Sequence, residues 1–138
     1  MSTSNNKTTD EARIRGLIEN WAQAVRAKDI DGIMANHAPD VLLFDVPLPV
    51  QWRGAEAYRK SWETFFPWFQ NSGVFELSEL SITAGEDVAF CHGLIRCGGT
   101  EANGKKVELV VRLTVCYRKI DGAWTVTHEH HSEPSRST

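Results

Sequence analysis

The ionisable residue that best suits catalysis in this chain is Asp45. It follows the apolar run Val41–Phe44 and precedes two prolines, Pro47 and Pro49. A carboxylate at the end of a buried strand is partly desolvated, which raises its pKa and suits a general base. The alternative is a structural acid that caps a turn or a helix where the strand ends. The position therefore predicts a candidate base without identifying a reaction.

A second candidate group lies near the end of the chain, where three of the five histidines fall within four positions. The segment 124–132 is typical of a strand, because Trp, Val and Thr suit a pleated, half-buried surface. Side chains alternate between the two faces of a strand, so His128 and His130 are predicted to share the face of Trp124 and Val126. This pair could move a proton or contact a ligand.

Two other interpretations of these histidines remain open. The rings could instead form hydrogen bonds across strands or lie in a subunit interface. A metal site would need a third ligand, and no carboxylate stands at a diagnostic spacing, so no metal is predicted. The opposite face of the strand would carry Thr125, Thr127, Glu129 and His131, and we expect both faces to be covered.

Arg112 and a set of aromatic residues are the remaining candidates for a site. Arg112 interrupts the apolar run Leu109–Val115, so it should either form a structural ion pair or reach a polar cavity and hold an anion. Most aromatic residues have helical spacing and should be core, but some could line a cavity and hold a planar apolar ligand. The predicted ligand contacts are Trp21, Trp52, Tyr58, Trp62 and Arg112.

The composition restricts the class of protein. A chain of 138 residues with 41% hydrophobic and 24% charged residues is typical of one soluble globular domain. The net charge of −3 gives no basic field for nucleic acid, and no apolar run is long enough for a bilayer. The polar N-terminus lacks the apolar core of a signal peptide, so we expect a cytoplasmic protein. Cys91, Cys97 and Cys116 lack metal or redox spacing and are predicted to be small buried residues in a reducing compartment.

Three helices are predicted in the first half of the chain. Residues 1–8 are predicted to be a disordered tail, and Thr9 or Asp10 should cap a helix that ends near Lys28. Asp29 should cap a short helix that ends before Pro39. A third helix should follow Gly54, with its apolar face formed by Tyr58, Trp62, Phe65, Phe66 and Phe69.

The second half of the chain has the pattern of long strands. Turn signals separate strand-like segments at 74–84, 87–98, 106–120 and 124–132. This order predicts an α+β fold, in which three N-terminal helices pack in a strongly curved antiparallel sheet that leaves a conical cavity. A single domain is predicted at 9–134, with 135–138 as a tail.

Several short segments together carry a resemblance to a known family. They are Asp29–Gly32, Phe44–Asp45, Trp52–Gly54, and Asp121–Val126 ahead of the histidine-rich end. With them the chain resembles the nuclear transport factor 2-like superfamily, and more narrowly its SnoaL-like and ketosteroid-isomerase-like members, over about 11–134. The last hairpin is also similar to the association domain of calcium/calmodulin-dependent kinase II.

The resemblance implies a role for Asp45, because the isomerase base is an Asp at the end of the first strand, ahead of a Gly that Gly54 matches. The family's first oxyanion donor, a Tyr on the first helix, is Trp21 here. An indole N–H can donate a hydrogen bond but cannot exchange a proton as a phenol does. No acid is present near Thr114–Cys116, where the family has its second oxyanion donor.

Two functions of different classes, an enzyme and a non-catalytic module, are therefore expected. The first is a small-molecule isomerase, cyclase or dehydratase without a cofactor, in which Asp45 takes a proton next to a carbonyl and His128 or His130 moves or stabilises it. The second is a non-catalytic module that binds a small apolar or aromatic ligand or associates with itself. A homodimer or larger ring through the sheet is predicted, because the late strands carry apolar residues on both faces.

Overall fold

The computed structural model describes residues 3–67, 70–101 and 103–135. It contains helices α1 (Thr3–Ala27), α2 (Ile30–Met34) and α3 (Ala55–Phe65), together with strands β1 (His37–Phe44), β2 (Trp52–Arg53), β3 (Gln70–Ala84), β4 (Val88–Thr100), β5 (Lys106–Ile120) and β6 (Ala123–Ser132). Trp68 and Phe69, which the sequence places near the end of the third helix, and the last residues of the predicted C-terminal tail lie outside the described residues.

The strands form one curved, unclosed sheet in the order β2-β1-β6-β5-β4-β3. Strands β3 to β6 are joined as an antiparallel meander, as predicted. The expectation of a wholly antiparallel sheet is wrong at one place, because β1 pairs with β6 in parallel. These two strands are far apart in the sequence, so no hairpin connects them and nothing forces an antiparallel pairing.

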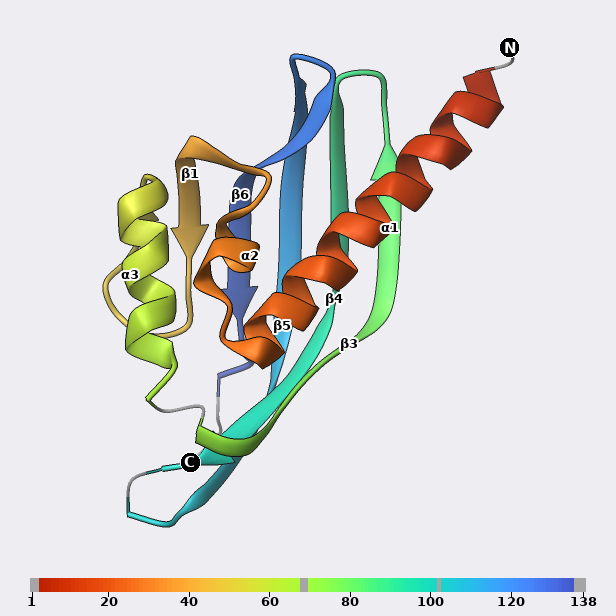
Figure 1. Cartoon of the computed structure of the whole chain (residues 1–138). Coiled ribbons are helices and arrows are strands. Elements are labelled where there is room, and N and C mark those ends of the chain that lie inside the picture. The colour runs from red at the N-terminus through yellow and green to blue at the C-terminus, as the bar shows by residue number, and fades with distance from the viewer. Residues whose placement is uncertain (1–2, 68–69, 102, 136–138) are drawn as a thin grey trace.

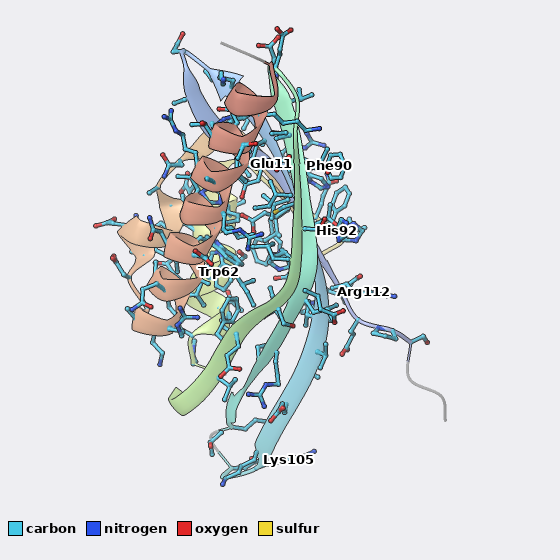
Figure 2. The ribbon with its side chains drawn as sticks, turned by 90° about the vertical axis from the view of Figure 1, so that its right-hand side faces the viewer. Glu11, Trp62, Phe90, His92, Lys105 and Arg112 are labelled. Carbon is cyan, nitrogen blue, oxygen red and sulfur yellow. The ribbon has the colours of Figure 1, made fainter. Side chains whose placement is uncertain are left out.

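The helices cover one face of the sheet and leave the other uncovered (Figure 1). Ile14, Ile18 and Val25 of α1 are buried against the sheet, which confirms the predicted helical stripe. Viewed from the side, Phe90, His92 and Arg112 point away from the helices (Figure 2). The core therefore lies between the helices and the inner face of the sheet.

Helix α1 begins at Thr3, earlier than the predicted start at Thr9 or Asp10. The polar segment before Asp10 contains neither Pro nor Gly, so nothing interrupts the backbone there. Once a helix is nucleated, each further residue adds a hydrogen bond at little cost. The predicted tail up to Thr8 is thus helical from Thr3 onward.

Two caps fix the helices that lie next to β1. Asp29 caps α2 as predicted, because its carboxylate accepts a hydrogen bond of 3.1 Å from the Gly32 N–H. Gly54 precedes α3 with φ 94°, a left-handed conformation that glycine adopts without strain. The Gly54 N–H donates to the carbonyl of Val41 at 2.7 Å, so the start of α3 is held beside β1.

Candidate active site

A β-bulge in β6 decides which side chains face the helices. Cys116 pairs with His128, but the next residue of β5, Tyr117, pairs with Val126, so one residue of β6 has no partner. Trp124 and Val126 are buried before this irregularity, and Glu129 and His131 are buried after it. An extra residue in one strand reverses the alternation beyond it. The prediction that His128 and His130 share the face of Trp124 is therefore wrong.

Glu129 is a fully buried carboxylate that accepts three hydrogen bonds from side chains. Its Oε2 accepts from the hydroxyl of Tyr58 at 2.7 Å and from Nε2 of His37 at 2.7 Å. Its Oε1 accepts from Nε2 of His131 at 3.2 Å. The Trp21 indole N–H donates to the Tyr58 oxygen at 3.0 Å, which holds the phenol in place. Residues from α1, α3, β1 and β6 thus meet at one acid.

His131 continues this network to Asp45. Its Nδ1 lies 3.3 Å from Asp45 Oδ1, while its Nε2 contacts Glu129. Both ring nitrogens therefore face carboxylates, and only the imidazolium can donate on both sides. His37 is held in the same way, between Glu129 and the carbonyl of Ala35 at 2.8 Å.

The electrostatics of this network agree with its geometry. Burial alone would lower the pKa of His131, but hydrogen bonds to Asp45 and Glu129 and their charges raise it to about 9. The pKa of His37 is also raised, because the hydrogen bond and charge of Glu129 outweigh burial. Burial would raise the pKa of Glu129, but its bonds from His131 and His37 lower it to about 2. Acidic and cationic groups thus alternate along the network.

The parallel pairing of β1 and β6 is what brings Asp45 to His131. Leu43 is in register with Glu129, and Phe44 with His130, so the next residues of the two strands lie side by side. The Val46 N–H donates to Asp45 Oδ1 at 2.8 Å, which fixes the carboxylate at the strand end. The pairing of β1 with β6 thus positions Asp45, the candidate base indicated by the sequence.

Asp45 and His131 lie in the wall of a cavity of about 400 Å³. The remaining lining is mostly apolar and includes Trp52, Trp62, Phe65, Phe75, Ile95 and Val111, supplied by α3 and by strands β2 to β5. Three predicted site residues, Asp45, Trp52 and Trp62, lie in this lining, and their roles in catalysis and ligand binding stay predictions. Cys97 also lines this cavity, and burial raises the pKa of its thiol to about 11.

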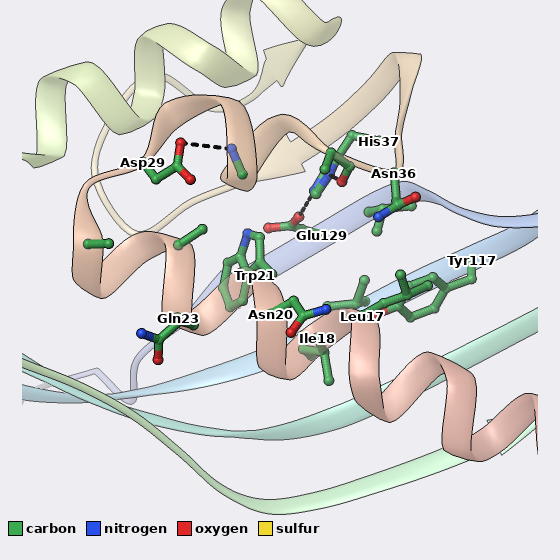
Figure 3. Close-up of a pocket in the computed structure, with 16 residues that line it drawn as sticks. Leu17, Ile18, Asn20, Trp21, Gln23, Asp29, Asn36, His37, Tyr117 and Glu129 are labelled. Atoms are coloured by element: carbon green, nitrogen blue, oxygen red, sulfur yellow. Dashed lines mark hydrogen bonds and ion pairs between the residues drawn. The ribbon is translucent and has the colours of Figure 1, made fainter.

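A second cavity, of about 280 Å³, lies under α1 and α2 on the other side of the network (Figure 3). Trp21, His37 and Glu129 line it, so Trp21 is not placed in the apolar cavity. Tyr58 is completely buried between the helices and Glu129. These two predicted ligand contacts instead support the buried acid.

Three predicted site residues lie away from Asp45, on or near the outer face of the sheet. Arg112 is exposed, and its Nε donates to Ser132 Oγ at 3.1 Å (Figure 2). His128 Nδ1 donates to the carbonyl of Leu42 at 2.7 Å, and His130 is exposed. The rings of His128 and His130 pack on Phe44 at centroid distances of 4.7 and 5.4 Å. The polar partner of Asp45 is His131 rather than any of these three.

Sequence reasoning missed His37, Glu129 and His131 as members of the site. Glu129 and His131 stand two positions apart, which is a usable signal for a shared strand face. Strict alternation from Trp124 placed Glu129 and His131 on the face opposite Trp124, whereas the bulge puts them on the same buried face. His37 had no signal, since its partner is far away in the sequence.

The described residues contain no group of three or more His, Cys, Asp or Glu side chains placed to hold a metal ion. In the same part of the chain, no helix has the length and apolar character needed to cross a membrane. Cys91 and Cys97 are buried, as predicted, and Cys116 is half-buried.

Comparison with known proteins agrees with this architecture. A search of curated proteins found no match. A crystal structure of an NTF2-like protein of unknown function from Pseudomonas putida is 41% identical, covers 94% of this chain and 89% of its own, and has a TM-score of 0.85. A ketosteroid isomerase-like protein from Erwinia carotovora shares the fold at 19% identity, with coverages of 92% and 98% and a TM-score of 0.78.

A third solved structure shares the fold at 21% identity and a TM-score of 0.75, over 91% of this chain and 88% of that one. It is a Xanthomonas campestris protein whose name likens it to the calcium/calmodulin-dependent protein kinase II association domain. The SnoaL-like domain family matches residues 14–136, which is most of the sequence. The chain therefore belongs to the SnoaL-like family and has the NTF2-like fold.

Proposed function

We propose that the protein binds a small, neutral, largely apolar carbonyl compound and catalyses an isomerisation, cyclisation or dehydration. Asp45 acts as the general base, and the His131 imidazolium acts as its cationic partner. The observation that carries the proposal is the contact between Asp45 and His131, with Nδ1 and Oδ1 3.3 Å apart, in the wall of an apolar cavity. Such a pair in a mostly apolar site is a typical place for acid-base chemistry.

Each group has a defined part in the reaction. Asp45 takes a proton from the carbon next to the carbonyl, and negative charge then develops on the carbonyl oxygen. The positive charge of His131 stabilises this oxyanion, because a fixed cation acts strongly in a site with little water. Glu129 keeps His131 charged and oriented from behind, through the 3.2 Å contact with Nε2. No cofactor enters this scheme.

The lining of the cavity supports an uncharged ligand. Asp45 and His131 offset each other's charge, and no Lys or Arg of the described residues lines the cavity. A permanently charged ligand would therefore lose its hydration without gaining a partner of opposite charge. Trp52, Trp62 and Phe75 offer flat apolar surfaces that suit an aromatic or alicyclic body.

Hydrogen–deuterium exchange at carbon tests the catalytic part without knowledge of the natural substrate. Cyclohexanone and 2-acetylnaphthalene are incubated with the protein in D2O, and loss of the α-proton signal is followed by NMR. We expect faster exchange with the wild type and loss of this gain in Asp45→Asn, measured below the melting temperature of the variant, which should fall because His131 loses one of its two carboxylates. Asp40→Asn is the matched control, because Asp40 is an exposed acid on the same strand. Equal exchange with Asp45→Asn and the wild type would contradict the proposal.

A homo-oligomer formed through the outer face of the sheet is the second candidate function. Val88, Phe90 and Val110 are 60%, 46% and 51% exposed on β4 and β5, where the alternation of buried and exposed residues puts them on the face that no helix of the described residues covers. A partner subunit would bury these side chains, and the fold neighbour named for an association domain supports this idea. Light scattering should detect a dimer or larger ring in the wild type and a smaller species for Phe90→Lys. A wild-type monomer at micromolar concentration would contradict it.

A further inference from the structure

The loop between β1 and β2 exposes more apolar surface than any other loop of the described chain. Leu48 is 90% exposed, Val50 85% and Val46 38%. The other large exposed hydrophobic residues lie on β4 and β5, where they have no connection with the apolar cavity. Three exposed apolar side chains on one short loop form a patch, and an exposed apolar patch is typical of a surface that binds a ligand or a partner.

This loop stands at the apolar cavity. Val46, Pro47 and Leu48 all belong to its lining, whereas Val50 does not. Leu48 therefore has one edge at the cavity and nearly all of its surface in solvent. A ligand that fills the cavity would offer the apolar surface that Leu48 lacks.

The loop is fixed at its ends and not in its middle. At its start, the Val46 N–H donates a hydrogen bond to Asp45. At its end, Trp52 pairs with Leu43 in the sheet. Just beyond, the Gly54 N–H donates to the carbonyl of Val41. Among the described residues, no backbone–backbone hydrogen bond involves the loop residues 47–50. The middle of the loop can thus shift toward the cavity without breaking the pairing that positions Asp45.

We propose that Leu48 packs onto the bound ligand and closes the apolar cavity over it. The inference rests on the proposed function, and it adds that the ligand is apolar on the side that faces this loop. A ligand with a polar group at that position would leave the group against Leu48 without a hydrogen-bond partner. Leu48 is accordingly a residue that determines specificity, and closure removes water from around Asp45 and His131.

Thiol protection tests the closure directly. Leu48→Cys and Val50→Cys are prepared, and the rate of alkylation of each new thiol by iodoacetamide is measured with and without saturating 2-acetylnaphthalene. We expect the ligand to slow the reaction of Leu48→Cys roughly tenfold or more, in line with the burial of one apolar side chain. Val50→Cys is the matched control, because Val50 is as exposed but does not line the cavity, and its rate should not change.

Binding supplies a second measurement. Leu48→Ala should weaken the binding of 2-acetylnaphthalene roughly tenfold and leave the melting temperature unchanged, because the side chain is exposed in the free protein. Val50→Ala, at an exposed residue of the same loop that does not line the cavity, should change neither quantity. Equal alkylation of Leu48→Cys with and without ligand, or unchanged affinity of Leu48→Ala, would overturn the inference.

Other outcomes separate this inference from the proposed function. Protection of both thiols before ligand is added would show that a partner subunit covers the loop, which overturns closure by Leu48. Binding and protection without α-proton exchange would remove the catalytic proposal and leave the role of Leu48 intact. Failure of the wild type to bind the ketones would contradict both.

Discussion

The two faces of β6 carry similar side chains in opposite environments. On the inner face, Glu129 and His131 are 1% and 7% exposed and belong to a chain of hydrogen bonds that ends at Asp45. On the outer side, the rings of His128 and His130 pack against Phe44 in T-shaped arrangements, and His130 is in contact with solvent. Sequence position alone does not distinguish neighbouring histidines, but burial and the groups around them do.

The difference follows from electrostatics in a dry interior. A buried imidazolium is unfavourable unless carboxylates compensate for lost hydration, and His131 has two such partners. An exposed ring on the outer face keeps its water and needs no fixed partner. The inner face can therefore hold a charged group in one orientation, which is what catalysis requires. This contrast leads to predictions that differ in size between the faces.

The largest effect is expected from Glu129→Gln. Without the carboxylate, His37 and His131 lose the acid that lies between them, so the free energy of unfolding should fall by roughly 3 kcal/mol or more. Urea denaturation followed by circular dichroism measures this change. His130→Gln, on the same strand, should stay within about 0.5 kcal/mol of the wild type. Similar values for the two variants would remove the distinction between the faces.

The second effect is a dependence of stability on pH. The pKa of His131 rises from 6.5 to about 9 on folding, so its contribution is complete below pH 6.5 and is lost as the pH rises through 9. At about 1.4 kcal/mol per pKa unit, this loss is about 3 kcal/mol. The raised pKa of His37 acts in the same direction.

On the acid side, the pKa of Glu129 falls from 4.5 to about 2, so its contribution is lost as the pH drops through that interval. Denaturation curves recorded from pH 6 to 9.5 check the alkaline part. His131→Gln should flatten the curve in this range, whereas His130→Gln should keep its slope. A wild-type protein equally stable at pH 6.5 and 9 would contradict the charge assignment.

A smaller effect is expected from Tyr58→Phe. This change removes one of the three donors to Glu129 and keeps the buried ring, so stability should fall by about 1–2 kcal/mol. Tyr117→Phe is the comparison, because Tyr117 is also buried and, among the described residues, the only hydrogen-bond partner of its hydroxyl is the weakly bonding thiol of Cys91. Thermal unfolding measures both variants. An equal or larger loss of stability for Tyr117→Phe would contradict a stabilising contribution of the hydrogen bond from Tyr58 to Glu129.

The smallest effect is expected from Arg112→Gln, on the outer face. The side chain is exposed and bonds only to the Ser132 hydroxyl among the described contacts, so stability should change by less than about 0.5 kcal/mol. Binding of a neutral ketone should not change, because Arg112 does not line the cavity. Isothermal titration calorimetry measures this affinity. A marked loss of binding would restore Arg112 as a ligand contact.

The sequence was sufficient to predict the order of the elements other than β2 and one residue of the candidate site. Helical and alternating patterns located α2, α3 and strands β3 to β6, and the apolar run before Asp45 singled out a residue that lines the apolar cavity. Pairing between distant strands left no local signal, so the parallel contact of β1 with β6 and the His37–Glu129 ion pair were not predicted. The bulge near Thr127 was not predicted either, because the sequence has no glycine there to indicate one.

The protonation state of His131 is the most direct test of the account. In protein labelled with 15N, the ring nitrogens of His131 are observed by NMR at pH 7.5 and titrated upward. We expect protons on both nitrogens at pH 7.5, deprotonation only near pH 9, and a lower pKa of His131 in Asp45→Asn because one of the two carboxylates is lost. A His131 ring with one unprotonated nitrogen at pH 7.5, and a pKa near the ordinary value of 6.5, would contradict this charge assignment.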